Sequence, residues 1–146
     1  RMTNAPLVLP TGEHWNVGGL FEGIVQGLTK ARQLYGDTIV SIGIDAFGNG
    51  YGLQASDGRL LGLPYHYRDA RTEGKMEHAF AQLSERDLLV ATGAQSYFFN
   101  TLFQVLADLD ARPPVTPIAK DLLFISDILN YWLCGVVGCE RTLWLS

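Results

Sequence analysis

The stretch Ser41-Ile-Gly-Ile-Asp-Ala-Phe-Gly-Asn-Gly-Tyr-Gly-Leu53 starts as an apolar run and ends in a turn dense in glycine. The apolar residues between positions 39 and 44 predict a buried strand that stops at Asp45. Glycine then occupies positions 48, 50 and 52. In open α/β sheets, small polar ligands bind just past the carboxyl ends of strands. The stretch therefore predicts a ligand site after the strand, while a tight turn alone also explains the glycines.

Helical and strand patterns surround this stretch and indicate an α/β fold. Apolar residues at helical spacing predict a helix from Leu20 to Tyr35, in which Gly23 and Gly27 would allow close packing. A hairpin is expected over residues 51–63, with its turn at 56–58. A second buried strand is expected over residues 122–125. Further helices are expected to begin at Thr72, at Ser84, at Asn100 or Thr101, and at Ser126 or Asp127.

Composition narrows the class of protein. Of the 146 residues, 47% are hydrophobic and 18% are charged, which is typical of a globular domain. The net charge is -4 and no lysine or arginine cluster exists, so we expect no nucleic-acid partner. The apolar runs are short, which predicts no membrane span, and residues 1–4 do not resemble a signal peptide. Cys134 and Cys139 lack redox or zinc spacing and predict ordinary thiols in the cytoplasm.

Nucleotide motifs are absent from the glycine-rich turn. Leu53 stands where a Gly-x-Gly-x-x-Gly motif needs its last glycine, and Gly74-Lys75 lacks the upstream glycine of a phosphate-binding loop. Asp45 has three open interpretations: a base, an acceptor for a hydroxyl group, or a capping residue. His66 and the tryptophans are interpreted as packing residues. No catalytic constellation and no metal-ligand set can be assembled from the histidines, cysteines and acids.

The order of several motifs resembles the rhamnulokinases, a branch of the FGGY carbohydrate kinases. The resemblance rests first on residues 43–53 and on 57–72, which include Pro64-Tyr-His-Tyr-Arg-Asp-Ala-Arg-Thr72. Thr92-Gly-Ala-Gln95 and Phe99-Asn-Thr-Leu-Phe-Gln104 resemble the family's Thr-Gly-Ile-Gln and Phe-Asn-Thr-Leu-Tyr-Gln. Asp127-Ile-Leu-Asn-Tyr-Trp-Leu133 resembles its Asp-Leu-Leu-Asn-Tyr-Trp-Leu. The resemblance runs from about residue 13 to residue 142.

The resemblance implies part of an actin-like, ribonuclease-H-like domain with a mixed sheet and flanking helices. Residues 1–14 would be an irregular lead-in, and residues 15–146 would be part of the N-terminal, sugar-binding domain, with the second domain absent. The reaction implied for the whole family is phosphoryl transfer from ATP, with Mg²⁺, to L-rhamnulose, giving L-rhamnulose 1-phosphate. The family's ATP-phosphate hairpin and its catalytic base have no match in this chain. We therefore expect no catalytic residue here, no ATP or Mg²⁺ binding by this chain alone, and no turnover.

The same resemblance implies where the sugar binds. Gly48 matches the glycine of the family's Thr-Trp-Gly-Val-Asp and would contact the sugar, together with its neighbours Phe47, Asn49 and Gly50. Ala46-Phe47 replaces Thr-Trp, and Gly50 replaces the aspartate, so a carboxylate that could hold a sugar hydroxyl is missing.

Two alternatives to a rhamnulose kinase stay open. One is a kinase for another ketose or polyol, which Phe47 and Gly50 would permit. The other is a truncated, non-catalytic domain that binds sugar weakly at most. The strand over 39–45 would normally pair with strands that have no match in this chain. Its unpaired edge would then allow self-association.

Overall fold

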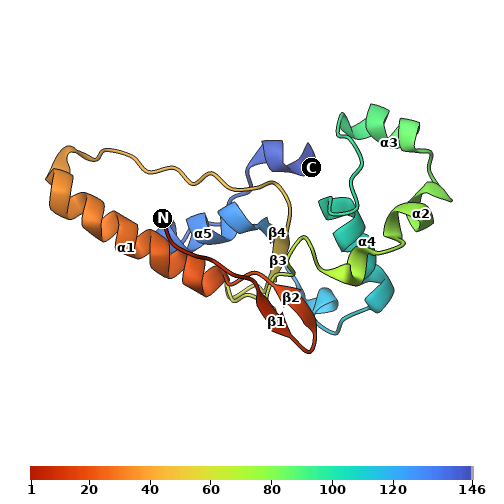
Figure 1. The fold of residues 1–146 in the computed structure, drawn as a ribbon, viewed down its shortest axis with the longest axis horizontal. Coiled ribbons are helices and arrows are strands. Elements are labelled where there is room, and N and C mark those ends of the chain that lie inside the picture. Colours follow the sequence, from red (N-terminus) through yellow and green to blue (C-terminus); the bar gives the residue numbers. More distant parts are fainter. Residues whose placement is uncertain (146) are drawn as a thin grey trace.

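A computed structural model describes residues 1–145, and the side chains of residues 1–143 (Figure 1). Four short strands lie in the middle, α1 extends to one side, and α2 to α4 lie on the other side. The strands are β1 (Leu7–Leu9), β2 (Gly12–His14), β3 (Tyr51–Gln54) and β4 (Asp121–Phe124). The helices are α1 (Val17–Tyr35), α2 (Lys75–Phe80), α3 (Glu85–Thr92), α4 (Thr101–Ala111) and α5 (Ile125–Cys134). Short 3-10 turns span Gly36–Thr38, Ala70–Thr72, Thr116–Ile118 and Arg141–Leu145.

The pairing of β3 with β4 forms the centre of the fold. The two strands are antiparallel, with Tyr51 opposite Phe124 and Gln54 opposite Asp121. The prediction of a strand near residues 122–125 is confirmed, one residue earlier. The hydrophobic core joins this sheet to α5 and to the start of α1; its buried members are Trp15, Val17, Leu123, Ile125, Ile128 and Leu129.

The predicted helix over residues 20–35 is confirmed as α1, which begins three residues earlier. Asn16 caps it by accepting a hydrogen bond from the Gly19 amide at 3.0 Å. The side chain of Met2 packs where a Cβ on Gly23 would lie, so this glycine does permit a close approach. Gly27 has open space beside it instead.

The predicted strand over residues 39–45 is wrong. The segment is extended but pairs with no strand among residues 1–145, and it runs alone from the far end of α1 back to β3 (Figure 1). Val40 is 94% exposed and Ile42 is 59% exposed. A strand needs a neighbour to take its backbone hydrogen bonds, and the apolar pattern alone supplies none. Self-association through this segment therefore stays a prediction.

The irregular lead-in expected over residues 1–14 is wrong for its second half. β1 and β2 form an antiparallel hairpin, in which Leu7 lies opposite His14 and Pro10-Thr11 lie in the turn. The pairing of these few residues gives their backbone groups partners, which the proline and glycine content did not indicate.

The hairpin expected over residues 51–63 forms only in part. Its turn closes, with the Ala55 amide donating to the Arg59 carbonyl at 2.9 Å. The second arm makes a single bridge, between Gln54 and Leu60. The longer pairing of β3 is with β4, and it buries Tyr51 of β3 together with Leu123 and Phe124 of β4.

The helices on the other side agree with the sequence in part. Ser84 caps α3 by accepting from the Asp87 amide at 3.1 Å, and Gly93 ends it, as predicted. Gly74, not Thr72, precedes α2. The spacing of the apolar residues in α4 predicts a buried face of Leu102, Val105, Leu106 and Leu109. The structure instead buries Thr101, Phe103, Gln104 and Ala107, because Gln104 is anchored inward by a 2.8 Å hydrogen bond to the Phe99 carbonyl.

Asp127 fixes the start of α5, so we expect Asp127→Ala to lower the free energy of unfolding by about 1–2 kcal/mol. Its buried carboxylate accepts from the Phe124 amide at 3.3 Å and from the Glu140 amide at 3.2 Å, and alanine would remove both of these contacts. Asp127→Asn is the comparison variant: its single amide oxygen can keep one of the two contacts, which use different carboxylate oxygens, so it should lose about half as much stability. Urea denaturation measures both variants, and an equal loss in the two would contradict the capping role.

Within residues 1–145, no helix combines the length and the apolar character that a membrane crossing requires.

Candidate functional site

The predicted sugar loop, Phe47 to Gly50, packs against Trp15 at the end of the β1–β2 hairpin. The rings of Phe47 and Trp15 are stacked, with centroids 4.4 Å apart and planes 10° apart. Trp15 is buried and is held by its backbone amide, which donates to the Pro64 carbonyl at 2.9 Å. Phe47 is 46% exposed, so the outer part of its ring is available to a ligand.

Gly50 is required by the geometry of this loop. Its φ is +97°, in the region that favours glycine, and a Cβ built on it would lie 2.9 Å from Trp15 Nε1. Gly48 and Gly52, by contrast, do not have positive φ. The backbone conformation therefore explains why residue 50 is glycine. The family's aspartate is replaced at the same position, where the backbone lies too close to the Trp15 indole for a side chain.

Two buried polar atoms of this region have no hydrogen-bond partner among the described residues. They are the indole nitrogen of Trp15, which is a donor, and Oδ1 of Asn49, which is an acceptor. An unsatisfied buried polar atom costs free energy unless a ligand or water completes it. Both atoms belong to the loop and its packing partner, so the loop offers a donor and an acceptor to a polar ligand.

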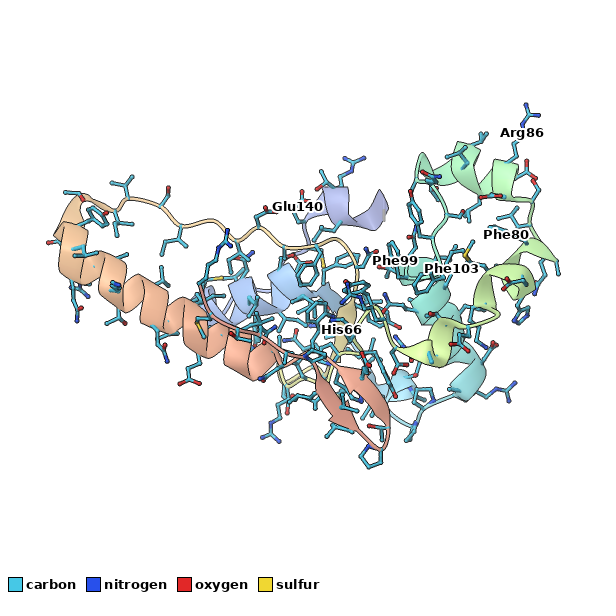
Figure 2. All side chains as sticks on the ribbon, in the orientation of Figure 1. His66, Phe80, Arg86, Phe99, Phe103 and Glu140 are labelled. Atoms are coloured by element: carbon cyan, nitrogen blue, oxygen red, sulfur yellow. The ribbon has the colours of Figure 1, made fainter. Side chains whose placement is uncertain are left out.

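Aromatic residues from two further segments extend the cluster. His66 lies 4.2 Å from Trp15, centroid to centroid, and Tyr67 lies 6.0 Å from it. Tyr67 also meets Phe99 edge to face at 5.9 Å. His66 lies beside the strands at the centre of the molecule, and Phe99 lies toward α4 (Figure 2). The site thus draws on residues 15, 47–50, 66–67 and 99.

The surroundings of His66 favour its neutral form. Burial lowers the pKa of its imidazole, and the Glu13 carboxylate, 3.8 Å from Nδ1, opposes that effect. The Arg68 amide donates to Nδ1 at 3.3 Å, which places the ring proton on Nε2. A neutral imidazole suits hydrogen bonding to an uncharged ligand better than ion pairing.

The structure brings two of the predicted residues, Phe47 and Gly50, against Trp15. Gly48 and Asn49 lie between them in the chain. Asp45 is exposed and lines the groove beside α1. Trp15, His66 and Tyr67 were not predicted as site residues. Trp15 and His66 were interpreted as packing residues, and the motif over residues 64–72 indicated the family without giving Tyr67 a role. The antiparallel bridge between His14 and Tyr65 is what places Trp15 beside His66, and no local pattern indicates that bridge.

Comparison with known proteins shows which family this chain is related to. No family model matches this chain. The rhamnulokinase of Mannheimia succiniciproducens is 41% identical over 130 residues, which are 89% of this chain and 27% of that protein. The rhamnulokinase of Klebsiella pneumoniae is 37% identical over 142 residues, 97% of this chain and 29% of that protein. The chain is a homologue of part of the rhamnulokinases. The resemblance predicted from the motifs is confirmed, and the chain spans less than a third of the length of these relatives.

Solved structures confirm the predicted fold. A ligand-bound xylulose kinase from Lactobacillus acidophilus superposes with a TM-score of 0.80 at 12% identity, covering 97% of this chain and 33% of that one. A gluconate kinase from the same organism gives 0.81 at 13% identity, covering 93% and 28%. At such identities the likeness concerns the fold alone. The chain therefore has the fold of part of these kinase structures.

Proposed function

We propose that this chain forms the sugar-binding portion of a carbohydrate kinase that converts L-rhamnulose to L-rhamnulose 1-phosphate. Its 37–41% identity to proteins named rhamnulokinase, over most of its length, supports this substrate. Because the chain spans less than a third of those proteins, the complete reaction is proposed for a longer assembly rather than for residues 1–146.

The observation that carries the proposal is the pairing of an exposed aromatic ring with unsatisfied polar atoms. Phe47 presents part of its ring, and Trp15 Nε1 and Asn49 Oδ1 lack partners among the described residues. A sugar has apolar C–H faces and hydroxyl groups that both donate and accept hydrogen bonds. Sites for such ligands combine apolar contact with a few well-placed polar groups.

We include ATP and Mg²⁺ in the proposal only because the related kinases are expected to use them. Within the described residues, no group of three or more His, Cys, Asp or Glu side chains could hold a metal ion. Binding of ATP and Mg²⁺ stays a prediction from the family, and we assign the described residues no step of phosphoryl transfer. Their role in the proposal is to bind and orient the sugar. A cytoplasmic location stays a prediction from Cys134 and Cys139, which are both free and exposed.

A kinase for another ketose or polyol is the second candidate. The close approach of Gly50 to Trp15 favours it, because no acidic side chain fits there to select one hydroxyl pattern. Titration calorimetry with L-rhamnulose, D-xylulose and D-gluconate separates the two candidates. Strongest binding of L-rhamnulose supports the first, and strongest binding of either other sugar supports the second.

Asn49→Ala is expected to weaken sugar binding by about tenfold, because it removes the unpaired acceptor Oδ1. Asn130→Ala, an exposed change on α5, is the matched control and should leave the affinity unchanged. Equal affinities of the two variants would remove Asn49 from the site. A coupled assay of ATP consumption should show no turnover by residues 1–146, and turnover would contradict the division of roles proposed above.

A further inference from the structure

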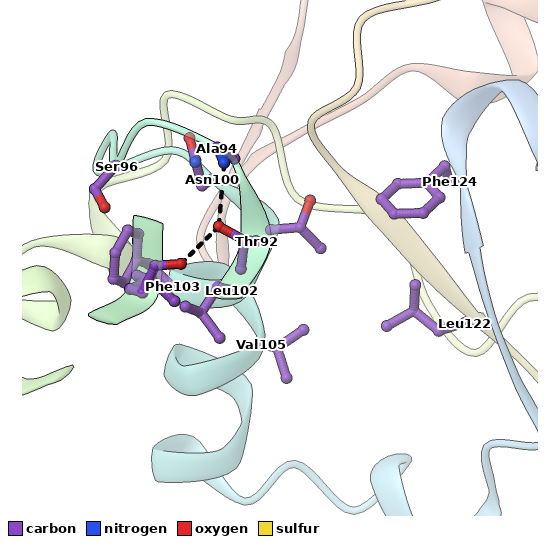
Figure 3. Close-up of a pocket in the computed structure, with 11 residues that line it drawn as sticks. Thr92, Ala94, Ser96, Asn100, Leu102, Phe103, Val105, Leu122 and Phe124 are labelled. Atoms are coloured by element: carbon purple, nitrogen blue, oxygen red, sulfur yellow. Dashed lines mark hydrogen bonds between the residues drawn. The ribbon is translucent and has the colours of Figure 1, made fainter. Parts of the chain in front are cut away.

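A cavity of about 280 Å³ lies between β4, α4 and the segment that leads into α4, away from the candidate sugar site. Figure 3 shows Leu122 and Phe124 on one side of it, and Ser96, Phe103 and Val105 on the other. None of its lining residues belongs to the Phe47–Gly50 loop or to the aromatic cluster around Trp15. It is therefore a different place from the candidate sugar site.

The walls of this cavity are made mainly of carbon. Phe103 and Phe124 each expose only 1% of their surface, and the side chains of Leu88, Val105 and Leu122 complete the apolar lining. Leu102, which is 47% exposed, lies at its rim. A charged or many-hydroxyl ligand would lose its hydration here without replacement, so such ligands are disfavoured.

Two hydroxyl groups in the lining lack partners. Thr101 is 8% exposed, and its Oγ1 makes no hydrogen bond within the described residues. Ser96 Oγ is also buried and unpaired there. Thr92 differs, because its hydroxyl donates to the Leu88 carbonyl at 2.9 Å and accepts from the Ala94 amide at 3.2 Å (Figure 3). The otherwise apolar cavity thus has two hydroxyl groups, of Thr101 and Ser96, that could hydrogen-bond to a ligand.

We propose that this cavity binds a neutral aromatic molecule that carries a single hydroxyl group. The aromatic ring would pack against Phe103 and Phe124, and the ligand hydroxyl would pair with Thr101. A dry apolar cavity of about 150 Å³ is known to hold benzene, so the volume found here suits a substituted ring. Substituted phenols are the class that meets the apolar, polar and size requirements together.

The test uses 4-ethylphenol and its matched hydrocarbon, ethylbenzene, against the whole chain. We expect 4-ethylphenol to bind about fivefold more tightly than ethylbenzene, because it alone can satisfy the hydroxyl groups. Methyl signals of Leu102, Val105 and Leu122 in NMR spectra should shift on binding, which places the ligand in this cavity. No shift with either compound, or shifts confined to residues outside the cavity, would overturn the proposal.

Thr101→Val tests the polar contact at constant shape. It should remove most of the preference for 4-ethylphenol while ethylbenzene still binds. Thr116→Val is the matched control: Thr116 Oγ1 is likewise buried and unpaired among the described residues, but it lies outside the cavity lining, so the preference should persist. If Thr101→Val fails to fold, Val105→Phe gives a second test, since its ring should fill the cavity and abolish binding of both compounds. An unchanged preference in Thr101→Val, or unchanged binding in Val105→Phe, would refute the site.

Discussion

Gly50→Ala is expected to lower the free energy of unfolding by about 2–4 kcal/mol. Part of the loss arises from the backbone, because a non-glycine residue is strained at a φ of +97°. The rest arises from the new Cβ, which would lie 2.9 Å from Trp15 Nε1 and push the indole from its stack on Phe47. Urea denaturation measures the stability, and tryptophan fluorescence reports the displaced indole.

Gly62 supplies a matched control for this prediction. Its φ is +96°, almost that of Gly50, but a Cβ there meets no atom of the described residues within 4 Å. Gly62→Ala should therefore show the backbone strain alone, and the excess loss in Gly50→Ala measures the contact with Trp15. Equal losses in the two variants would mean that Trp15 does not constrain Gly50. Gly50→Asp should likewise bring no gain in sugar affinity, since its Cβ displaces Trp15 before its carboxylate can serve as a ligand.

The sequence predicted the parts of the fold that local physics determines. The cap of Ser84 on α3 and the helical pattern of α1 each depend on residues close together in the chain. The fold class followed from the order of motifs. The segment over 39–45 was mispredicted because strand formation depends on a partner, which an apolar pattern does not specify.

The candidate site, too, could be predicted from the sequence only in part. The loop at residues 47–50 could be located from its motif, but its contents could not. Trp15 and His66 are 51 positions apart, and the hydrogen bond from the His66 amide to the Glu13 carbonyl, at 2.8 Å, is what aligns their segments. Likewise, the face of α4 depends on Gln104, whose inward position is set by Phe99 and not by the spacing of its leucines.

Asp108→Ala is expected to destabilise the protein by about 3 kcal/mol, because it removes one member of a largely buried charge network. The Asp108 carboxylate accepts hydrogen bonds from the Tyr51 hydroxyl of β3 and from the Arg71 guanidinium. The Arg71 side chain is 15% exposed, and it also lies over the Tyr65 ring at 4.0 Å. Alanine at position 108 would leave a guanidinium charge and a hydroxyl without their acceptor.

Asp110→Ala is the control on the same helix. Asp110 pairs with Lys75 at 2.6 Å, but that pair lies near the surface, and exposed ion pairs contribute little to stability. The denaturation midpoint of Asp110→Ala should therefore stay close to that of the unchanged protein. If Asp108→Ala proved as mild as Asp110→Ala, the network would not hold β3 to α4.

The same network predicts how stability depends on pH. Burial, and then the hydrogen bond to Asp108, raise the pKa of the Tyr51 hydroxyl above its ordinary value. The folded state therefore favours the protonated phenol, and this contribution to stability is complete below about pH 10, the pKa of an unfolded tyrosine. It is lost as pH rises further, because only the unfolded chain then releases the proton. Tyr51→Phe cannot ionise at this position, so its free energy of unfolding should fall less steeply between pH 9 and pH 11, as urea titrations at each pH would measure. Parallel curves for the two proteins would show that Tyr51 ionises as easily in the folded state as in the unfolded one, which the buried contact with Asp108 argues against.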